Sequence, residues 1–253
     1  MEQDLTTGSV FKRIVYFSLP YLLSYFLQTL YGMADLFITG QFYGVDTITA
    51  VSNGSQIMHM MTVIIVGLAM GTTVTIGHSV GAKCMEQAEK IIGNTITLFM
   101  GIAVAFTVIL VVLVKPIVVL IATPQEAVAG TSIYLLICFI GIPFITAYNI
   151  ISSIFRGLGD SKSPMYFIGI ACVMNIALDY LFMGAFHMGA AGAALGTVCA
   201  QTFSVLVTLW VIRRRKTGIS LKKSDFKIER AVIGQVLKIG IPVALQDGFI
   251  QVA

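Results

Sequence analysis

The sequence predicts an all-α integral membrane protein, a six-helix transmembrane bundle followed by a truncated seventh helix. Three observations support this prediction. Of the 253 residues, 57% are hydrophobic and 11% are charged, whereas soluble domains carry about 25% charged residues. Several apolar runs reach the about 20 residues that a helix needs to cross the hydrocarbon core. Finally, lysine and arginine gather in alternate connections between these runs.

Six apolar runs are long enough to span a bilayer, and another begins near residue 234. The connection between the fifth and sixth runs, "GAFHMGAAG", carries no charge, but its glycines mark a turn. The predicted spans cover residues 14–39, 55–80, 91–114, 130–155, 164–186 and 190–212.

The seventh segment resembles the first. "YFSLPYLLSYFLQTLY" (16–31) aligns with "KIGIPVALQDGFIQVA" (238–253), and Pro20 then matches Pro242. Parallel repeats of this kind build some secondary transporters. A span that stops in mid-membrane is unfavourable, because its last backbone polar groups would lie unpaired in the hydrocarbon core. We therefore expect a second lobe that this chain lacks. The expected units are a membrane lobe at 1–212, a basic cytoplasmic inter-lobe loop at 213–233 and the truncated start of the second lobe at 234–253.

The placement of positive charge predicts the orientation. Fifteen of the sixteen lysines and arginines lie before the first span, in alternate connections or at the start of the seventh span, and Lys115 is the exception. Positively charged connections stay in the cytoplasm. We therefore expect a multi-pass protein of the cell (plasma or inner) membrane with a cytoplasmic amino terminus.

Acidic residues interrupt three apolar segments, at Asp35, Asp179 and Asp247. A charged acid at mid-bilayer costs roughly 2.5–3.5 kcal/mol on insertion scales, and such residues usually face a bundle interior and serve a pathway. Asp247 lies in the incomplete seventh segment, so its role stays open. Asp35 and Asp179 are the stronger candidates for a functional site.

Depth in the membrane places four polar side chains together. Asp35 and Asp179 each lie on the order of 5–10 Å below the predicted outer boundary, at 1.5 Å per helical residue. Thr197 reaches a similar depth on the sixth span, and Asn175 precedes Asp179 by one helical turn on the same face. Four oxygen-bearing side chains from three helices outline a cation or proton site. Alternatively, they could be structural, because acids near the boundary can reach water and polar side chains also join helices.

Other chemistry finds little support in the sequence. The four cysteines show no metal-binding spacing, and His59 and His78 have no second ligand at helical spacing. No nucleophile–base pair or metal-ligand cluster stands out, so we do not expect an enzyme, a cofactor or a metal beyond Na⁺ at the acidic site. Nucleic acid is not an expected partner.

Several motifs resemble those of the multidrug and toxic compound extrusion (MATE) family. They are "ADLFITGQFYG" on the first span, "GHSVGAK" after the second, "FRGLGDSKSP" between the fourth and fifth, "NIALD" on the fifth and "MGAAGAALGT" opening the sixth. Two positions depart from the family pattern. Gln41 stands where the family often has histidine, and His78 stands where glutamine is common.

The resemblance implies one lobe of a twelve-helix, two-lobe antiporter that expels organic cations against inward proton or sodium flow. It also implies a cation site at Asp35, Asn175, Asp179 and Thr197, the four residues that the depth argument selects independently. A tyrosine of the fourth span, Tyr134, joins the site by resemblance alone.

These expectations define a hypothesis of cation-coupled (H⁺ or Na⁺) export of organic drugs or metabolites, expected to be cationic, across the cytoplasmic membrane. Ion uptake by the two acids would remove net charge from a site that excludes water. This change would let the first span bend at Pro20 and Gly32, where its backbone hydrogen bonding is weakest. The expected partners are an amphipathic or cationic small molecule, the lipid bilayer and the second lobe, without which we expect no activity.

Two alternatives remain open. A lipid-linked oligosaccharide flippase should carry cationic residues in its central cavity, and the six predicted spans show none there. A non-transporting membrane scaffold subunit would show no cation dependence.

Overall fold

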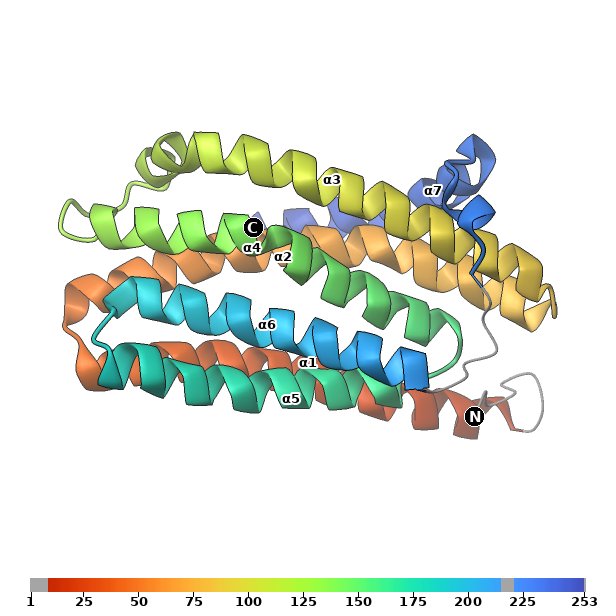
Figure 1. Ribbon diagram of the computed structural model, residues 1–253, viewed down its shortest axis with the longest axis horizontal. Coiled ribbons are helices and arrows are strands. Elements are labelled where there is room, and N and C mark those ends of the chain that lie inside the picture. The colour runs from red at the N-terminus through yellow and green to blue at the C-terminus, as the bar shows by residue number, and fades with distance from the viewer. Residues whose placement is uncertain (1–8, 215–220, 253) are drawn as a thin grey trace.

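The computed structural model describes residues 9–214 and 221–252, and these form a bundle of long helices lying side by side (Figure 1). The amino terminus (1–8) and part of the expected inter-lobe loop (213–233) therefore lie outside the described residues. Two short segments accompany the long helices, the π-helix η1 (Tyr180–Ala185) and the 3₁₀-helix η2 (Lys223–Phe226). The long helices are α1 (Val10–Phe42), α2 (Val45–Gly81), α3 (Met85–Leu120), α4 (Val128–Gly157), α5 (Lys162–Asp179), α6 (Gly189–Arg214) and α7 (Arg230–Val252).

The prediction of an all-α membrane bundle with the beginning of a seventh helix is confirmed. Within the described residues, α2, α3, α4, α6 and the continuous segment from α5 through η1 are long and apolar enough to cross a membrane. α1 has 33 residues but does not meet the same composition criterion.

The helices extend beyond the predicted spans. α2 begins at Val45, whereas the predicted span begins at residue 55, and α7 begins at Arg230 rather than near 234. The apolar length of a span is set by the hydrocarbon core. A helix can continue past that core wherever its backbone groups remain paired, so hydropathy underestimates its length.

α4 is the centre of the bundle. It packs against α2, α3 and α6, while α5 lies between α1 and α6. Its side chains supply much of the main hydrophobic core, including Tyr134, Leu135, Phe139 and Ile142, which are at most 2% exposed. The interior is therefore already packed around α4 within this lobe.

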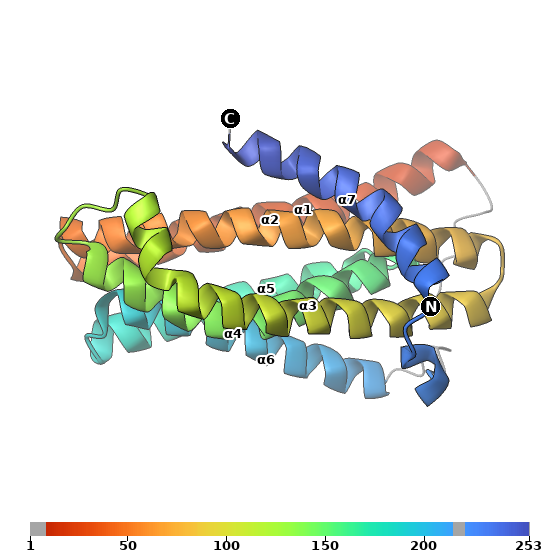
Figure 2. The ribbon, with the colours of Figure 1, turned by 90° about the horizontal axis from the view of Figure 1, so that it is seen from above.

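α7 crosses α2 obliquely (Figure 2) and packs closely against it. A Cβ added to Gly71 would lie 2.0 Å from the carbonyl oxygen of Val236, and one added to Gly240 would lie 2.4 Å from that of Leu68. Small residues allow helix backbones to approach in this way. The glycines thus let the seventh helix rest directly on the first lobe.

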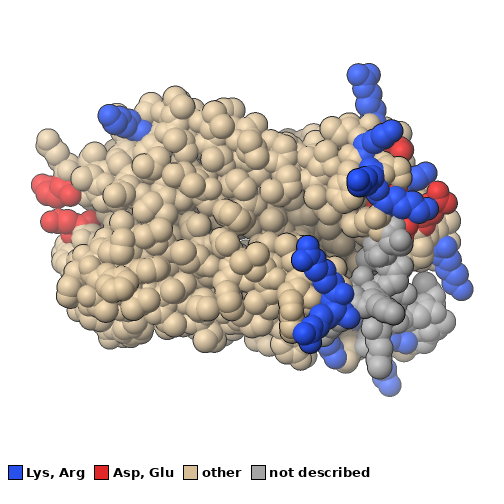
Figure 3. Space-filling model, viewed as in Figure 1, with Lys and Arg blue, Asp and Glu red and all other residues tan. Residues whose placement is uncertain are grey.

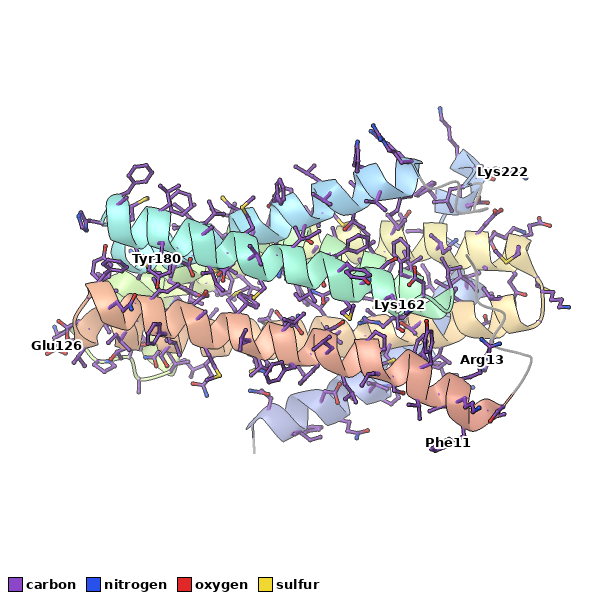
Figure 4. The ribbon with its side chains drawn as sticks, turned by 90° about the horizontal axis from the view of Figure 1, so that it is seen from below. Phe11, Arg13, Glu126, Lys162, Tyr180 and Lys222 are labelled. Atoms are coloured by element: carbon purple, nitrogen blue, oxygen red, sulfur yellow. The ribbon has the colours of Figure 1, made fainter. Side chains whose placement is uncertain are left out.

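Basic side chains are concentrated at one end of the bundle. Most of the lysines and arginines that Figure 3 shows gather at the end where α7 begins, with some acidic side chains among them, and acidic side chains also appear at the opposite end. Arg13 and Lys222 lie at the basic end, and Glu126 lies at the opposite end (Figure 4). The lysines and arginines that alternate connections carry in the sequence are therefore brought together mainly at one end of the bundle.

Candidate functional site

Two acidic side chains are buried in the half of the bundle that lies away from the basic end. Asp35 on α1 is 3% exposed, and Asp179, the last residue of α5, is 0% exposed. Tyr180, the next residue after Asp179, lies toward the same end as Glu126 (Figure 4). Neither acid faces lipid, although both belong to largely apolar helices.

The four polar residues that the depth argument selects lie together. Thr197 Oγ1 on α6 donates a hydrogen bond of 3.2 Å to Asp35 Oδ2. Asp35 also interacts with Asp179 and Asn175 on α5. Three helices therefore converge on one polar cluster, in which two carboxylates are close enough to influence one another.

Several polar atoms of this cluster have no hydrogen-bond partner within the described residues. They include one oxygen of Asp35, both carboxylate oxygens of Asp179 and both amide atoms of Asn175. Buried polar groups are nearly always paired, because an unpaired one loses its bonds to water without replacement. A proton or a cation would satisfy the oxygen atoms among these groups.

The donor set suits a hard cation rather than a transition metal. Its potential ligands are the carboxylate, amide and hydroxyl oxygens of the cluster, which favour hard ions, whereas imidazole and thiolate select softer metals. The described residues contain no group of three or more His, Cys, Asp or Glu side chains that could hold a metal ion.

The backbone changes its winding directly after Asp179. Residues 180–185 form a π-helix, a rare form that frequently occurs at functional sites. Tyr43 fastens this segment, since its hydroxyl donates to the carbonyl of Met183 at 3.1 Å and accepts from the backbone N–H of Gly189 at 2.9 Å. The wide turn is thereby tied to the start of α6, beside the acidic cluster.

Tyr134 lies beside the cluster but bonds elsewhere. It is 2% exposed on α4, and its hydroxyl shares a 2.9 Å hydrogen bond with Ser55 of α2. Its ring packs against Gly54, where an added Cβ would lie 2.2 Å from the ring. Tyr134 is within electrostatic range of Asp35, but the hydrogen bond of its hydroxyl joins α4 to α2.

Two further polar side chains belong to this neighbourhood, and sequence reasoning missed them. Tyr31 interacts with Gln201 and lies within electrostatic range of both acids. Gln201 is 5% exposed, and its Oε1 has no partner within the described residues. A helical-spacing signal could have found both, because Tyr31 precedes Asp35 by one turn and Gln201 follows Thr197 by one turn.

The two expected hinge residues lie within an unbroken helix. α1 continues through Pro20, and Ser24 donates to the carbonyl of Pro20 at 2.8 Å. A Cβ added to Gly32 would meet nothing within 4 Å. Bending at these positions stays a prediction. Asp247 lies on α7, and its role also stays open.

Comparison with known proteins identifies the family. The MatE family model matches residues 20–181, which is more than half of the chain. The chain is 34% identical over 244 residues to the probable multidrug resistance protein YpnP of Bacillus subtilis, covering 96% of this chain and 54% of that protein. It is also 26% identical to the multidrug export protein MepA of Staphylococcus aureus, over 94% of this chain and 53% of the relative.

Solved structures agree with the sequence match. A MOP superfamily transporter from Pyrococcus furiosus superimposes with a TM-score of 0.89 at 25% identity, covering 96% of this chain and 54% of that one. The chain thus spans about half the length of the relatives it matches. With the helical bundle and the motif pattern, these matches establish that the chain belongs to the MatE (MATE) family of membrane transporters.

Proposed function

We propose that this chain forms the cation-binding lobe of a cation-coupled exporter of organic, cationic compounds. The observation that carries the proposal is the pair of buried carboxylates, Asp35 and Asp179, in a cluster where several polar atoms have no hydrogen-bond partner among the described residues. The names of YpnP and MepA refer to multidrug resistance and export, which supports a drug-like substrate.

In this proposal the coupling ion reduces the electrostatic repulsion between the two buried carboxylates. Two negative charges close together in a medium of low dielectric repel strongly, and each also loses its hydration on burial. One proton or Na⁺ bound between Asp35 and Asp179 would neutralise part of this charge. Asn175 and Thr197 supply further oxygens, so either ion is compatible with the side chains present.

The position of the site supports ion entry from the outer side. Asp35 lies about 10 Å from the end of α1, at 1.5 Å per residue. The basic residues gather at the opposite end (Figure 3), which the positive-inside rule places in the cytoplasm. An external ion would thus reach the acids without crossing the whole bundle.

Coupling requires a shape change and a second lobe. In our proposal, ion binding makes a compact site favourable, α1 bends at Pro20 and Gly32, and an organic cation is displaced. Linkage then requires that the compound weaken ion binding by the same factor. The relatives are about twice as long as this chain, which supports a second lobe as a partner in transport.

The flippase alternative receives less support. The polar side chains of the acidic cluster are carboxylates, an amide and a hydroxyl, with no lysine or arginine among them, and the half-buried Arg156 lies apart from it in the last turn of α4. A lipid-linked phosphate would need such cations. The alternative of a non-transporting scaffold subunit does not explain why two acids interact at one depth in the membrane.

Substitution of one acid tests the proposal. In the two-lobe transporter reconstituted in vesicles, Asp179→Asn should abolish H⁺- or Na⁺-driven export of a fluorescent organic cation while insertion and folding persist. Asp46→Asn is the matched control, because Asp46 is an exposed acid at the start of α2. Ion-driven export by Asp179→Asn at the rate of the unsubstituted protein would refute the proposal.

A further inference from the structure

A glycine of α6 lies directly behind one carboxylate of the acidic cluster. A Cβ added to Gly196 would lie 2.1 Å from Asp179 Oδ1, 3.2 Å from Asp179 Cγ and 3.6 Å from Asn175 Nδ2. Cβ atoms do not approach other heavy atoms as closely as the first of these distances. The carboxylate therefore occupies the space that any other residue at position 196 would fill.

The backbone does not require glycine at this position. Among the described glycines, positive φ angles occur at Gly159 and Gly189, whereas Gly196 lies in the interior of α6. Glycine in a helix interior is less favourable than alanine, because it loses more conformational freedom on folding. The benefit that offsets this cost is the close approach of α6 to Asp179.

Other close glycines of this region meet apolar groups instead. A Cβ on Gly192 would lie 3.0 Å from Met183 Cγ, and one on Gly141 would lie 2.5 Å from Val198 Cγ2. These contacts fit ordinary helix packing. At Gly196 the facing atom is a buried carboxylate oxygen that has no hydrogen-bond partner within the described residues.

The next residue along α6 touches the other acid. Thr197 donates its hydroxyl hydrogen to Asp35 Oδ2, while Gly196 faces Asp179. Two consecutive residues of one helix thus contact the two carboxylates of the pair. Because α6 is a rigid element, the position of its backbone limits how far apart these carboxylates can lie.

We infer that Gly196 is a positioning residue for the cation site: the absence of a side chain there lets the Asp179 carboxylate lie against α6, at the separation from Asp35 that one shared cation requires. This inference rests on the proposed function, since it assigns a role within the same site. Gly196 itself donates no ligand. It acts by leaving a space that the carboxylate fills.

The test compares two alanine substitutions of similar steric severity. Gly196→Ala places a methyl group against Asp179, and Gly141→Ala places one against Val198. The chain is held in lipid nanodiscs, and its thermal unfolding midpoint is followed during titration with Na⁺ and, separately, with H⁺. A cation that binds only the folded state raises this midpoint. The apparent cation affinity should fall at least tenfold in Gly196→Ala and change less than twofold in Gly141→Ala.

A second measurement identifies the contact itself. In an Asp179→Ala background the facing carboxylate is absent, so adding Gly196→Ala should lower stability much less than it does in the unsubstituted chain. Such non-additivity is the signature of two groups in contact. If Gly196→Ala alone prevents folding, the Asp179→Ala/Gly196→Ala pair should restore it, and failure to restore it would overturn the inference.

The outcomes separate the inference from the proposed function. An unsubstituted chain whose midpoint responds to neither cation would refute the proposed site, and the positioning role with it. A chain that responds, with equal affinity in Gly196→Ala, would refute the positioning role alone. Equal losses of affinity in Gly196→Ala and Gly141→Ala would assign the effect to general packing and would also overturn the inference.

Discussion

A buried asparagine fastens the segment that leads into α7 to the first lobe, and removing it should free that segment. Asn94 on α3 is 1% exposed. Its Nδ2 donates to the carbonyl of Asp225 at 3.1 Å, and its Oδ1 accepts from the backbone N–H of Glu229 at 2.6 Å. Asn94→Leu fills a similar volume but removes both bonds.

The expected effect follows from the groups left behind. An unpaired buried acceptor costs about 1–3 kcal/mol, and the substitution leaves one at the carbonyl of the buried Asp225, whereas the exposed Glu229 can bond to water instead. The connection should therefore be destabilised by roughly 1–3 kcal/mol. Every 1.4 kcal/mol corresponds to a factor of ten, so amide exchange at Glu229 should accelerate at least about fivefold.

Hydrogen–deuterium exchange measured by mass spectrometry checks this result on peptides that cover residues 223–229. Asn149→Leu is the matched control, because Asn149 is a buried asparagine that donates within α4, to the carbonyl of Ile145 at 2.8 Å. Exchange in Asn94→Leu within twofold of the unsubstituted chain would refute the reasoning, as would equal acceleration in both variants.

Three further substitutions test other contacts of the bundle. Thr197→Val removes the hydrogen bond to Asp35 and should lower the free energy of unfolding by about 1–3 kcal/mol. Denaturant titration in detergent measures this change, and unchanged stability would argue against that bond. Gly71→Leu should push α7 away from α2, because a Cβ there would lie 2.0 Å from the carbonyl oxygen of Val236. Amide exchange along α7 should therefore become faster, and an unchanged exchange rate would contradict the close crossing. Tyr134→Phe keeps the ring but loses the bond to Ser55, so stability should fall by about 0.5–1.5 kcal/mol, and a more stable variant would be inconsistent with this contact.

The fold class was accessible from the sequence because membrane insertion imposes a simple rule. A helix must present about 20 apolar residues to cross the bilayer, and the runs around α2 to α6 meet that length. Helix ends were less accessible. α2 begins at Val45, ten residues before the predicted span, because helical backbone pairing continues where hydropathy no longer requires it.

Part of the candidate site could also be found from the sequence. Asp35 and Asp179 stood out because a charge in an apolar run is costly, and equal depth grouped them with Asn175 and Thr197. Tyr31 and Gln201 carry no charge, so the cost of burying a charge did not single them out. Only their spacing of one helical turn from Asp35 and from Thr197 indicates that they share the faces of those residues.

The sequence by itself determined the helical bundle, its division into spans and the level at which its acids lie, because hydropathy and a fixed rise per residue set depth along a helix axis. Only the tertiary structure decided lateral placement: that Asp35 and Asp179 face one another, that Gly196 leaves room for one carboxylate, and that Asn94 holds the connection to α7. Rotation and approach of helices depend on packing between segments far apart in the chain, and a one-dimensional pattern does not specify that packing.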